Sequence, residues 1–128
     1  MEKSDNQFSI PARLKSFKYA IQGFVYIVRY EHNARIHLFI TGAILIMGFL
    51  LHIRKMEWVL VLLCMGLVLS VEMINTAIEK LSDIVSPQKN EKIRVIKDIS
   101  AAMVLVSSII AMIAGLIIFL PHLGRLFL

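Results

Sequence analysis

The chain has 128 residues, of which 58% are hydrophobic and 18% are charged, and its formal net charge is +5. A water-soluble domain of this length could not cover so much apolar side chain with so little polar surface, which excludes a soluble globular enzyme. The composition therefore indicates an integral membrane protein. The sequence shows no repeat and no long linker, so we expect a single domain over residues 1–128.

The first predicted element is a surface helix over about residues 11–32. Ser9 followed by Pro11 is typical of a helix start. Apolar residues then recur at spacings of three and four, at Leu14, Phe17, Ile21, Phe24 and Val28. Because lysines and arginines fall on the other faces, this is a basic amphipathic helix, which is expected to lie in the plane of the lipid headgroups. The alternative is a helix that packs against soluble protein.

Three apolar stretches follow, and we predict membrane spans over about residues 36–53, 58–79 and 99–120. Trp58 is an interfacial anchor by residue type and opens the second span. The helix of that span is expected to continue to near Val85, before a break at Pro87. Pro121 is expected to end the third span.

The predicted fold class is therefore an all-α integral membrane protein, with an N-terminal amphipathic surface helix and three transmembrane helices. Gly42 and Gly48 would allow close helix approach in the first span. A tight turn is expected over residues 52–57, between the first and second spans.

The basic residues set the expected orientation. Only Arg54, Lys55 and Arg125 fall on one side of the spans, whereas those of the surface helix and of residues 80–97 fall on the other. The positive-inside rule places the second group in the cytoplasm and the C-terminus outside.

A polar stripe ends the second span. Asn75, Glu79 and Asp83 lie within about 60° of Glu72 around a helix. A carboxylate inside such a span costs at least about 2.5 kcal/mol, so it is usually functional and faces protein or water. Three spans alone could not surround this stripe, which gives a physical motive for an oligomer.

Depth separates the two glutamates of the stripe. If Trp58 marks the outer boundary, Glu72 lies about 21 Å into a hydrocarbon core about 30 Å thick, and Glu79 lies about 31 Å in, at the water boundary. One helix face thus presents one carboxylate to membrane-dissolved molecules and another to soluble, charged ligands. This arrangement suits a reaction between the two.

Phosphoryl transfer to a lipid alcohol would use both levels. Glu72 could take the proton of a lipid hydroxyl, and Glu79 could bind Mg²⁺, which prefers oxygen ligands and bridges nucleotide phosphates. Glu31, before the first span, is a candidate second metal ligand, and Lys97 is placed to meet phosphate charge. The common phosphate-binding loops of soluble nucleotide sites are absent from the sequence.

Structural alternatives stay open at several of these positions. Asn75 could be an interhelical hydrogen-bonding group, Asp98 could complement a helix dipole, and Glu31 could pair with Arg35. Lys97 could bind a lipid headgroup. A different function class is an oligomeric ion or proton channel lined by the two glutamates, although such a channel would not need Glu31 and Lys97.

The polar clusters resemble those of a known family. The string EMINTAIEKLSD at residues 72–83, the segment YEHNARIH at residues 30–37 and the pair Lys97 and Asp98 occur in the order typical of prokaryotic diacylglycerol kinases. The resemblance covers roughly residues 14–120. It implies an ATP- and Mg²⁺-dependent lipid kinase of the bacterial plasma membrane, with a cytoplasmic active site and no nucleic-acid partner.

The resemblance also implies a homotrimer whose active sites are shared between neighbouring subunits. In that family pattern Glu72 is similar to the general base, and Asn75 to its positioning partner. The positions that match metal ligands are Glu31 and Glu79. Those that match the nucleotide site are Gly23, Glu31, Glu79, Asp83, Lys97 and Asp98.

The family divides by substrate, and the pattern of residues 31–37 resembles the branch that phosphorylates undecaprenol more than the branch that phosphorylates diacylglycerol. We therefore expect an undecaprenol kinase, with diacylglycerol kinase as the alternative. The chain departs from the family pattern at Ile96, where a small residue is common. It departs again at Ala102 and Met103, where a Gly-Ala pair is common.

Overall fold

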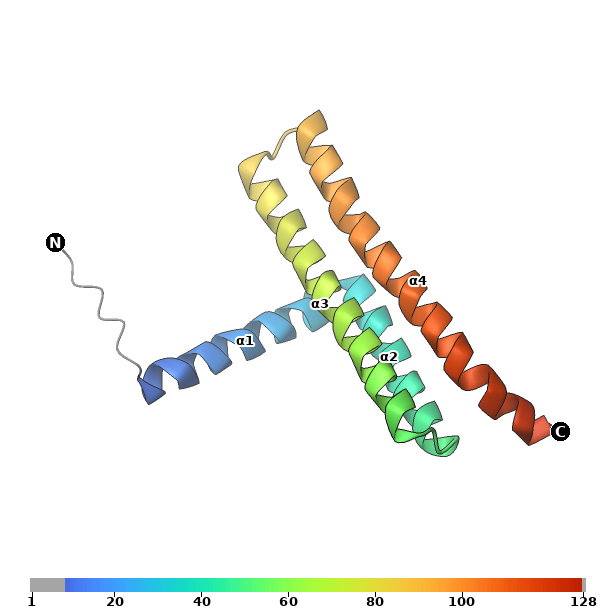
Figure 1. Cartoon of the computed structure of the whole chain (residues 1–128). Coiled ribbons are helices and arrows are strands. Elements are labelled where there is room, and N and C mark those ends of the chain that lie inside the picture. Colours follow the sequence, from blue (N-terminus) through green and yellow to red (C-terminus); the bar gives the residue numbers. More distant parts are fainter. Residues whose placement is uncertain (1–8, 128) are drawn as a thin grey trace. The chain divides into compact units, whose positions relative to one another are not determined.

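The computed structural model describes residues 9–127, and all their regular structure is α-helical, which confirms the predicted fold class. The helices are α1 (Ile10–Tyr30), α2 (His32–Leu50), α3 (Lys55–Val85) and α4 (Glu91–Phe127), as Figure 1 shows. Within the described part of the chain, α2, α3 and α4 are long and apolar enough to cross a membrane. The chain forms two compact units, divided between Glu31 and His32, which are described separately below.

The N-terminal unit consists of α1. Pro11 lies in its first turn, as the sequence predicts, and the helix ends where Glu31 takes an extended backbone and donates its N–H to the carbonyl of Ile27 at 2.9 Å. No residue of α1 is buried, and side chains such as Phe17 and Ile21 are exposed. An apolar face without a protein partner within this unit fits the predicted surface helix.

In the second unit, α3 and α4 run antiparallel and are joined by residues 86–90 (Figure 1). The helix α3 ends at Val85, as predicted. The side-chain oxygen of Asn90 accepts backbone N–H groups of Lys92 and Ile93 at the start of α4, at 2.9 and 3.4 Å. These bonds satisfy two of the N–H groups that a helix start leaves without intrahelical partners.

The contact between α3 and α4 follows a seven-residue spacing. On α3 the buried set includes Val61, Val68, Asn75 and Ser82, and on α4 it includes Ser100 and Ser107. A seven-residue repeat keeps one seam of each helix against its partner. Small polar residues in that seam let the two backbones approach closely and form hydrogen bonds inside an apolar bundle.

The turn between α2 and α3 is shorter than expected and occupies residues 51–54. His52 has a φ of 50°, in the left-handed region that few residues other than glycine adopt. At the start of α3, the backbone N–H of Arg54 donates to Oε2 of Glu57 at 2.7 Å, and its guanidinium donates to Oε1 at 2.9 Å. These two bonds allow α3 to begin at Lys55, several residues earlier than the predicted span.

Pro121, the predicted end of the third span, does not end the helix, because α4 continues to Phe127. Proline cannot donate an N–H to the carbonyl four residues earlier, here that of Ile117, but helices in membranes tolerate such a loss. Here Nδ1 of His122 lies 2.9 Å from the carbonyl oxygen of Ile118, and its Nε2 lies 3.5 Å from Oε2 of Glu57. His122 thus ties α4 to α3.

Gly48 and Gly42 differ in their surroundings. A Cβ atom on Gly48 would lie 2.9 Å from Cη2 of Trp58 and 3.2 Å from Cδ1 of Ile53, whereas one on Gly42 meets nothing within 4 Å in the described residues. The predicted close approach therefore occurs at Gly48 and not at Gly42. The Trp58 ring packs over the glycine and also against Phe49, at 4.7 Å between ring centroids.

We expect Gly48→Ala to lower the unfolding midpoint relative to Gly42→Ala. Overpacking costs about 1–3 kcal/mol, whereas alanine in an open helical position gains up to about 1 kcal/mol. Unfolding in sodium dodecyl sulfate, followed by the fluorescence of Trp58, the single tryptophan of the chain, measures the difference. Equal midpoints for the two variants would contradict the close packing of Trp58 on Gly48.

Candidate active site

The polar stripe predicted on the second span lies on the C-terminal half of α3. Glu72 and Asn75 are 3% and 7% exposed, Glu79 is half-buried, and Asp83 is exposed. Burial therefore decreases along the helix in the order that the depth argument requires. Both groups assigned to the lipid side are inside the bundle, whereas Glu79 and Asp83, assigned to the nucleotide side, are half-buried and exposed.

Glu72 faces a histidine that the sequence analysis did not assign to the site. Nε2 of His37, in the second turn of α2, lies 3.9 Å from Oε2 of Glu72, and the two side chains are 21% and 4% exposed. The pair joins α2 to α3 at the level of the buried carboxylate. The imidazole can hold a proton beside a group proposed to accept one.

Asn75 is held by a serine of α4. The hydroxyl of Ser100, which is 1% exposed, donates to Oδ1 of Asn75 at 2.6 Å and lies 3.0 Å from the carbonyl oxygen of Lys97. The interhelical hydrogen bond considered for Asn75 is therefore present. Because the amide oxygen accepts this bond, the amide NH₂ group is left as the donor of the side chain.

One helical turn before Ser100, Lys97 reaches back to α3. Its Nζ lies 2.9 Å from Oδ1 of Asp83. Lys97 precedes the uncharged stretch of α4, and its hydrogen bond to Asp83 raises its pKa, with a further contribution from the negative charges of Asp83 and Glu79. Lys97 therefore carries a positive charge at neutral pH, beside two carboxylates.

Asp98 is not part of this group. Its side chain is 64% exposed and its Oδ2 lies 3.6 Å from a guanidinium nitrogen of Arg94, one turn earlier on α4. Arg94 also forms an ion pair with Glu91. Since adjacent helical residues point about 100° apart, Lys97 and Asp98 face different surroundings. A role for Asp98 at the nucleotide stays a prediction.

The two remaining residues assigned to the nucleotide lie in the N-terminal unit. Gly23 is near the middle of α1, and a Cβ atom on it would meet nothing within 4 Å in the described residues. Glu31 directly follows α1 and is half-buried.

The described residues contain no group of three or more side chains of the His, Cys, Asp and Glu type that could hold a metal ion. Mg²⁺ does not require such a group, because it is commonly bound through one or two carboxylates together with water and substrate phosphates. The half-buried Glu79, on the solvent side of Glu72, has the oxygen donors for this kind of site.

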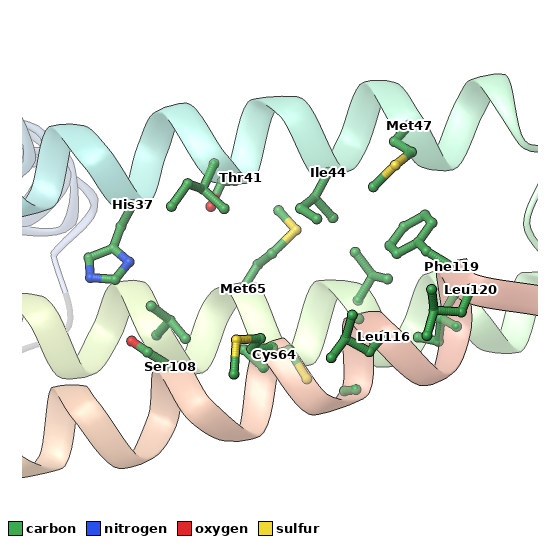
Figure 2. Close-up of a pocket in the computed structure, with 18 of the residues that line it drawn as sticks. His37, Thr41, Ile44, Met47, Cys64, Met65, Ser108, Leu116, Phe119 and Leu120 are labelled. Carbon is green, nitrogen blue, oxygen red and sulfur yellow. The ribbon is translucent and has the colours of Figure 1, made fainter. Parts of the chain in front are cut away.

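An apolar cavity of about 500 Å³ lies between α2, α3 and α4 (Figure 2). His37 and Thr41 line one end and Phe119 and Leu120 the other, and the wall between them is mostly aliphatic and thioether side chain. Because His37 also faces Glu72, the cavity ends near the buried carboxylate. The serine in its wall, Ser108, has a buried hydroxyl with no hydrogen-bond partner among the described residues.

Two site residues were thus missed by the sequence analysis, His37 and Ser100. His37 could have been assigned to the site from the sequence, because it belongs to the polar cluster of residues 30–37. In addition, α2 starts at the level in the bundle where α3 carries Glu72. Ser100 gives no signal in the sequence, since one serine at the start of an apolar stretch is ordinary.

Comparison with known proteins agrees with this geometry. Residues 18–119 match the family described as prokaryotic diacylglycerol kinase. The chain is 35% identical to the undecaprenol kinase of Bacillus subtilis over 123 residues, which cover 96% of the chain and 100% of that protein. It is also 35% identical to the diacylglycerol kinase of Synechocystis sp. over 114 residues, which cover 88% of the chain and 65% of that protein. The chain is therefore a member of the prokaryotic diacylglycerol kinase family of lipid kinases.

Proposed function

We propose that this lipid kinase transfers the γ-phosphate of ATP to undecaprenol, at the cytoplasmic face of the bacterial plasma membrane, as a Mg²⁺-dependent homotrimer. The observation that carries the proposal is a buried carboxylate at the end of an apolar cavity, in a chain that matches an undecaprenol kinase over that protein's full length. A long isoprenoid alcohol has one polar atom and an extended apolar chain, and this site offers one polar end and an apolar wall.

The lipid side of the reaction is assigned to Glu72, Asn75 and His37. The isoprenoid chain would occupy the cavity, with its hydroxyl at the His37 end, near Glu72. Glu72 accepts the hydroxyl proton as the lipid oxygen bonds to the γ-phosphorus, and the bond from that phosphorus to the β–γ bridging oxygen breaks to release ADP. The proton on Glu72 then passes to solvent, with His37 as the adjacent group that can carry it. The NH₂ group of Asn75, fixed by Ser100, positions the reacting oxygen.

The nucleotide side is assigned to residues near the water boundary. Glu79 would hold Mg²⁺, which when bound neutralises charge on the nucleotide phosphates. The role of Glu31 as a second ligand rests on the family pattern alone. Lys97 is charged and close to Asp83, so it can move from that carboxylate to a phosphate oxygen when nucleotide binds. Roles for Gly23, Asp83 and Asp98 in nucleotide binding are proposed on the family pattern alone.

The cytoplasmic placement rests on the distribution of lysine and arginine, because these residues surround the Glu79 end and are sparse at the other. The homotrimer rests on the family resemblance. The physical motive considered for it, exposure of Glu72 to lipid, does not apply, since Glu72 is 3% exposed within the single chain.

The second candidate function is phosphorylation of diacylglycerol. It is supported by the equal identity, 35%, to a diacylglycerol kinase. The ion-channel alternative has no comparable support, because both relatives are kinases.

Rates of γ-phosphate transfer to undecaprenol and diacylglycerol in one detergent test the proposed substrate. We expect faster transfer to undecaprenol, because the chain matches an undecaprenol kinase over that protein's full length. A clear preference for diacylglycerol would select the second candidate function.

The catalytic assignment is tested by Glu72→Gln, which keeps the size of the side chain and removes its basicity. Loss of a general base lowers turnover by about 10²–10⁴-fold. Glu91→Gln, which removes an exposed carboxylate at the start of α4, should retain the wild-type rate. If Glu72→Gln is fully active with either lipid, Glu72 is not the base.

The metal assignment is tested by Glu79→Gln. We expect the Mg²⁺ concentration at half-maximal rate to rise by about tenfold or more, since a charged oxygen ligand is lost. The KM for the lipid should change little, because Glu79 lies on the solvent side of Glu72. An unchanged Mg²⁺ dependence would remove Glu79 from the metal site.

The cavity is tested by Ala111→Phe, which places a ring in its wall, against Ala43→Phe, an exposed position of α2 outside the cavity lining. The first variant should raise the KM for undecaprenol more than the KM for a short isoprenoid alcohol, because the short chain needs less of the cavity. Equal effects of the two variants on both alcohols would show that the chain binds elsewhere.

A further inference from the structure

A second cavity, of about 490 Å³, lies at the opposite end of the three-helix unit from Glu79 and Lys97. Its polar lining consists of basic side chains, His52 and Arg54 from the turn before α3 and His122 and Arg125 from the end of α4. Its remaining lining is three leucines of α2, the turn and α4. No step of the proposed kinase reaction uses this cavity.

The charges around the cavity favour an anion. Arg54, Lys55 and Arg125 are the lysines and arginines at this end of the unit, and two of them line the same cavity. The carboxylate at this end, Glu57, does not line the cavity and is only 7% exposed. It forms an ion pair with the guanidinium of Arg54 at 2.9 Å and lies 3.5 Å from Nε2 of His122. A guanidinium has five N–H donors, and the side chain of Arg54 is 81% exposed, so it can bind a second anion while it holds Glu57.

The leucines indicate what kind of anion fits. A soluble phosphate gains nothing from aliphatic walls, whereas a phospholipid places its phosphate beside the start of its acyl chains. The cavity lies at the level of Trp58, a residue type that prefers the membrane–water boundary, where headgroups are found. Arginine in turn matches phosphate oxygens with two parallel N–H donors.

His52, in the lining of this cavity, has an unusual backbone conformation. A φ of 50° is one that glycine adopts without steric cost and that a larger residue adopts only where its surroundings hold it. The strained residue in this turn is one of the four basic groups of the lining.

We propose that this cavity binds the phosphate group of an anionic phospholipid in the membrane leaflet opposite the kinase site. Arg125 and Arg54 bind the phosphate oxygens, His52 and His122 line the sides of the site, and the leucines contact the acyl chains. The proposal concerns a second site and holds whichever lipid alcohol the kinase phosphorylates.

Native mass spectrometry of the full chain in detergent tests the proposal, by counting bound phosphatidylglycerol and phosphatidylcholine per subunit. We expect phosphatidylglycerol to bind in excess, and the double variant His52→Gly/Arg125→Gln to reduce its affinity at one site by about tenfold. Glycine suits the backbone at position 52, and Arg125 is exposed, so the variant should keep the wild-type helix content and kinase rate. Arg125→Gln alone gives the same readout with less change to the turn.

Lys55→Gln is the matched control, because it removes a positive charge at the same end without altering the cavity lining. Loss of one phosphatidylglycerol in the double variant and its retention in Lys55→Gln support the proposal. Retention in the double variant, or an equal loss in Lys55→Gln, overturns it. Full displacement of the lipid by millimolar inorganic phosphate would assign the cavity to a free anion and overturn the lipid assignment.

Quenching of Trp58 locates the bound lipid, since this tryptophan belongs to the same end of the unit and packs, like Leu51, against the buried cluster that includes Ile53. Phosphatidylglycerol with brominated acyl chains should quench Trp58 more than brominated phosphatidylcholine, and the difference should shrink in the double variant. Equal quenching by the two lipids in the wild type would contradict a site at this end.

Discussion

A carboxylate and an amide are kept inside an apolar helical bundle, and the site depends on the polar contacts that make this possible. Glu72 faces His37 of α2, and Asn75 accepts a hydrogen bond from Ser100 of α4. Burying such groups without partners is costly, so each is matched by a polar residue of a different helix. The same two contacts tie α2 and α4 to the helix that carries the stripe.

The polar groups along α3 lie in two different environments, one buried and one near solvent. Glu72 and Asn75 are buried next to a cavity with apolar walls, and one to three turns later Glu79 and Asp83 lie near Lys97 and solvent. A lipid alcohol and a nucleotide can therefore reach one helix face from different phases. The membership of the chain in a family of lipid kinases agrees with this division.

Much of the fold was predictable because helix periodicity and hydropathy act locally. The helical class, the stripe on α3 and the end of α3 at Val85 all follow from such patterns. The predicted turn over residues 52–57 was wrong, because Glu57 caps the start of α3 at Arg54, a local bond that the apolar pattern does not show. The continuation of α4 past Pro121 was not predicted either. Ser100 and the separation of Asp98 from Lys97 also depend on which residue of α4 lies opposite which residue of α3. The proposed oligomer could not be argued from Glu72, since the chain covers that side chain itself.

The connection of residues 86–90 has a consequence for how the site is assembled. It joins two antiparallel helices whose paired groups, Asn75 with Ser100 and Asp83 with Lys97, lie at successive distances from the turn. The connection therefore acts like the loop of a helical hairpin. Its length fixes the register of α4 against α3, and with it both residue pairs. A slip of α4 by one residue would separate Ser100 from Asn75 and Lys97 from Asp83 together, so this short connection keeps both pairs aligned.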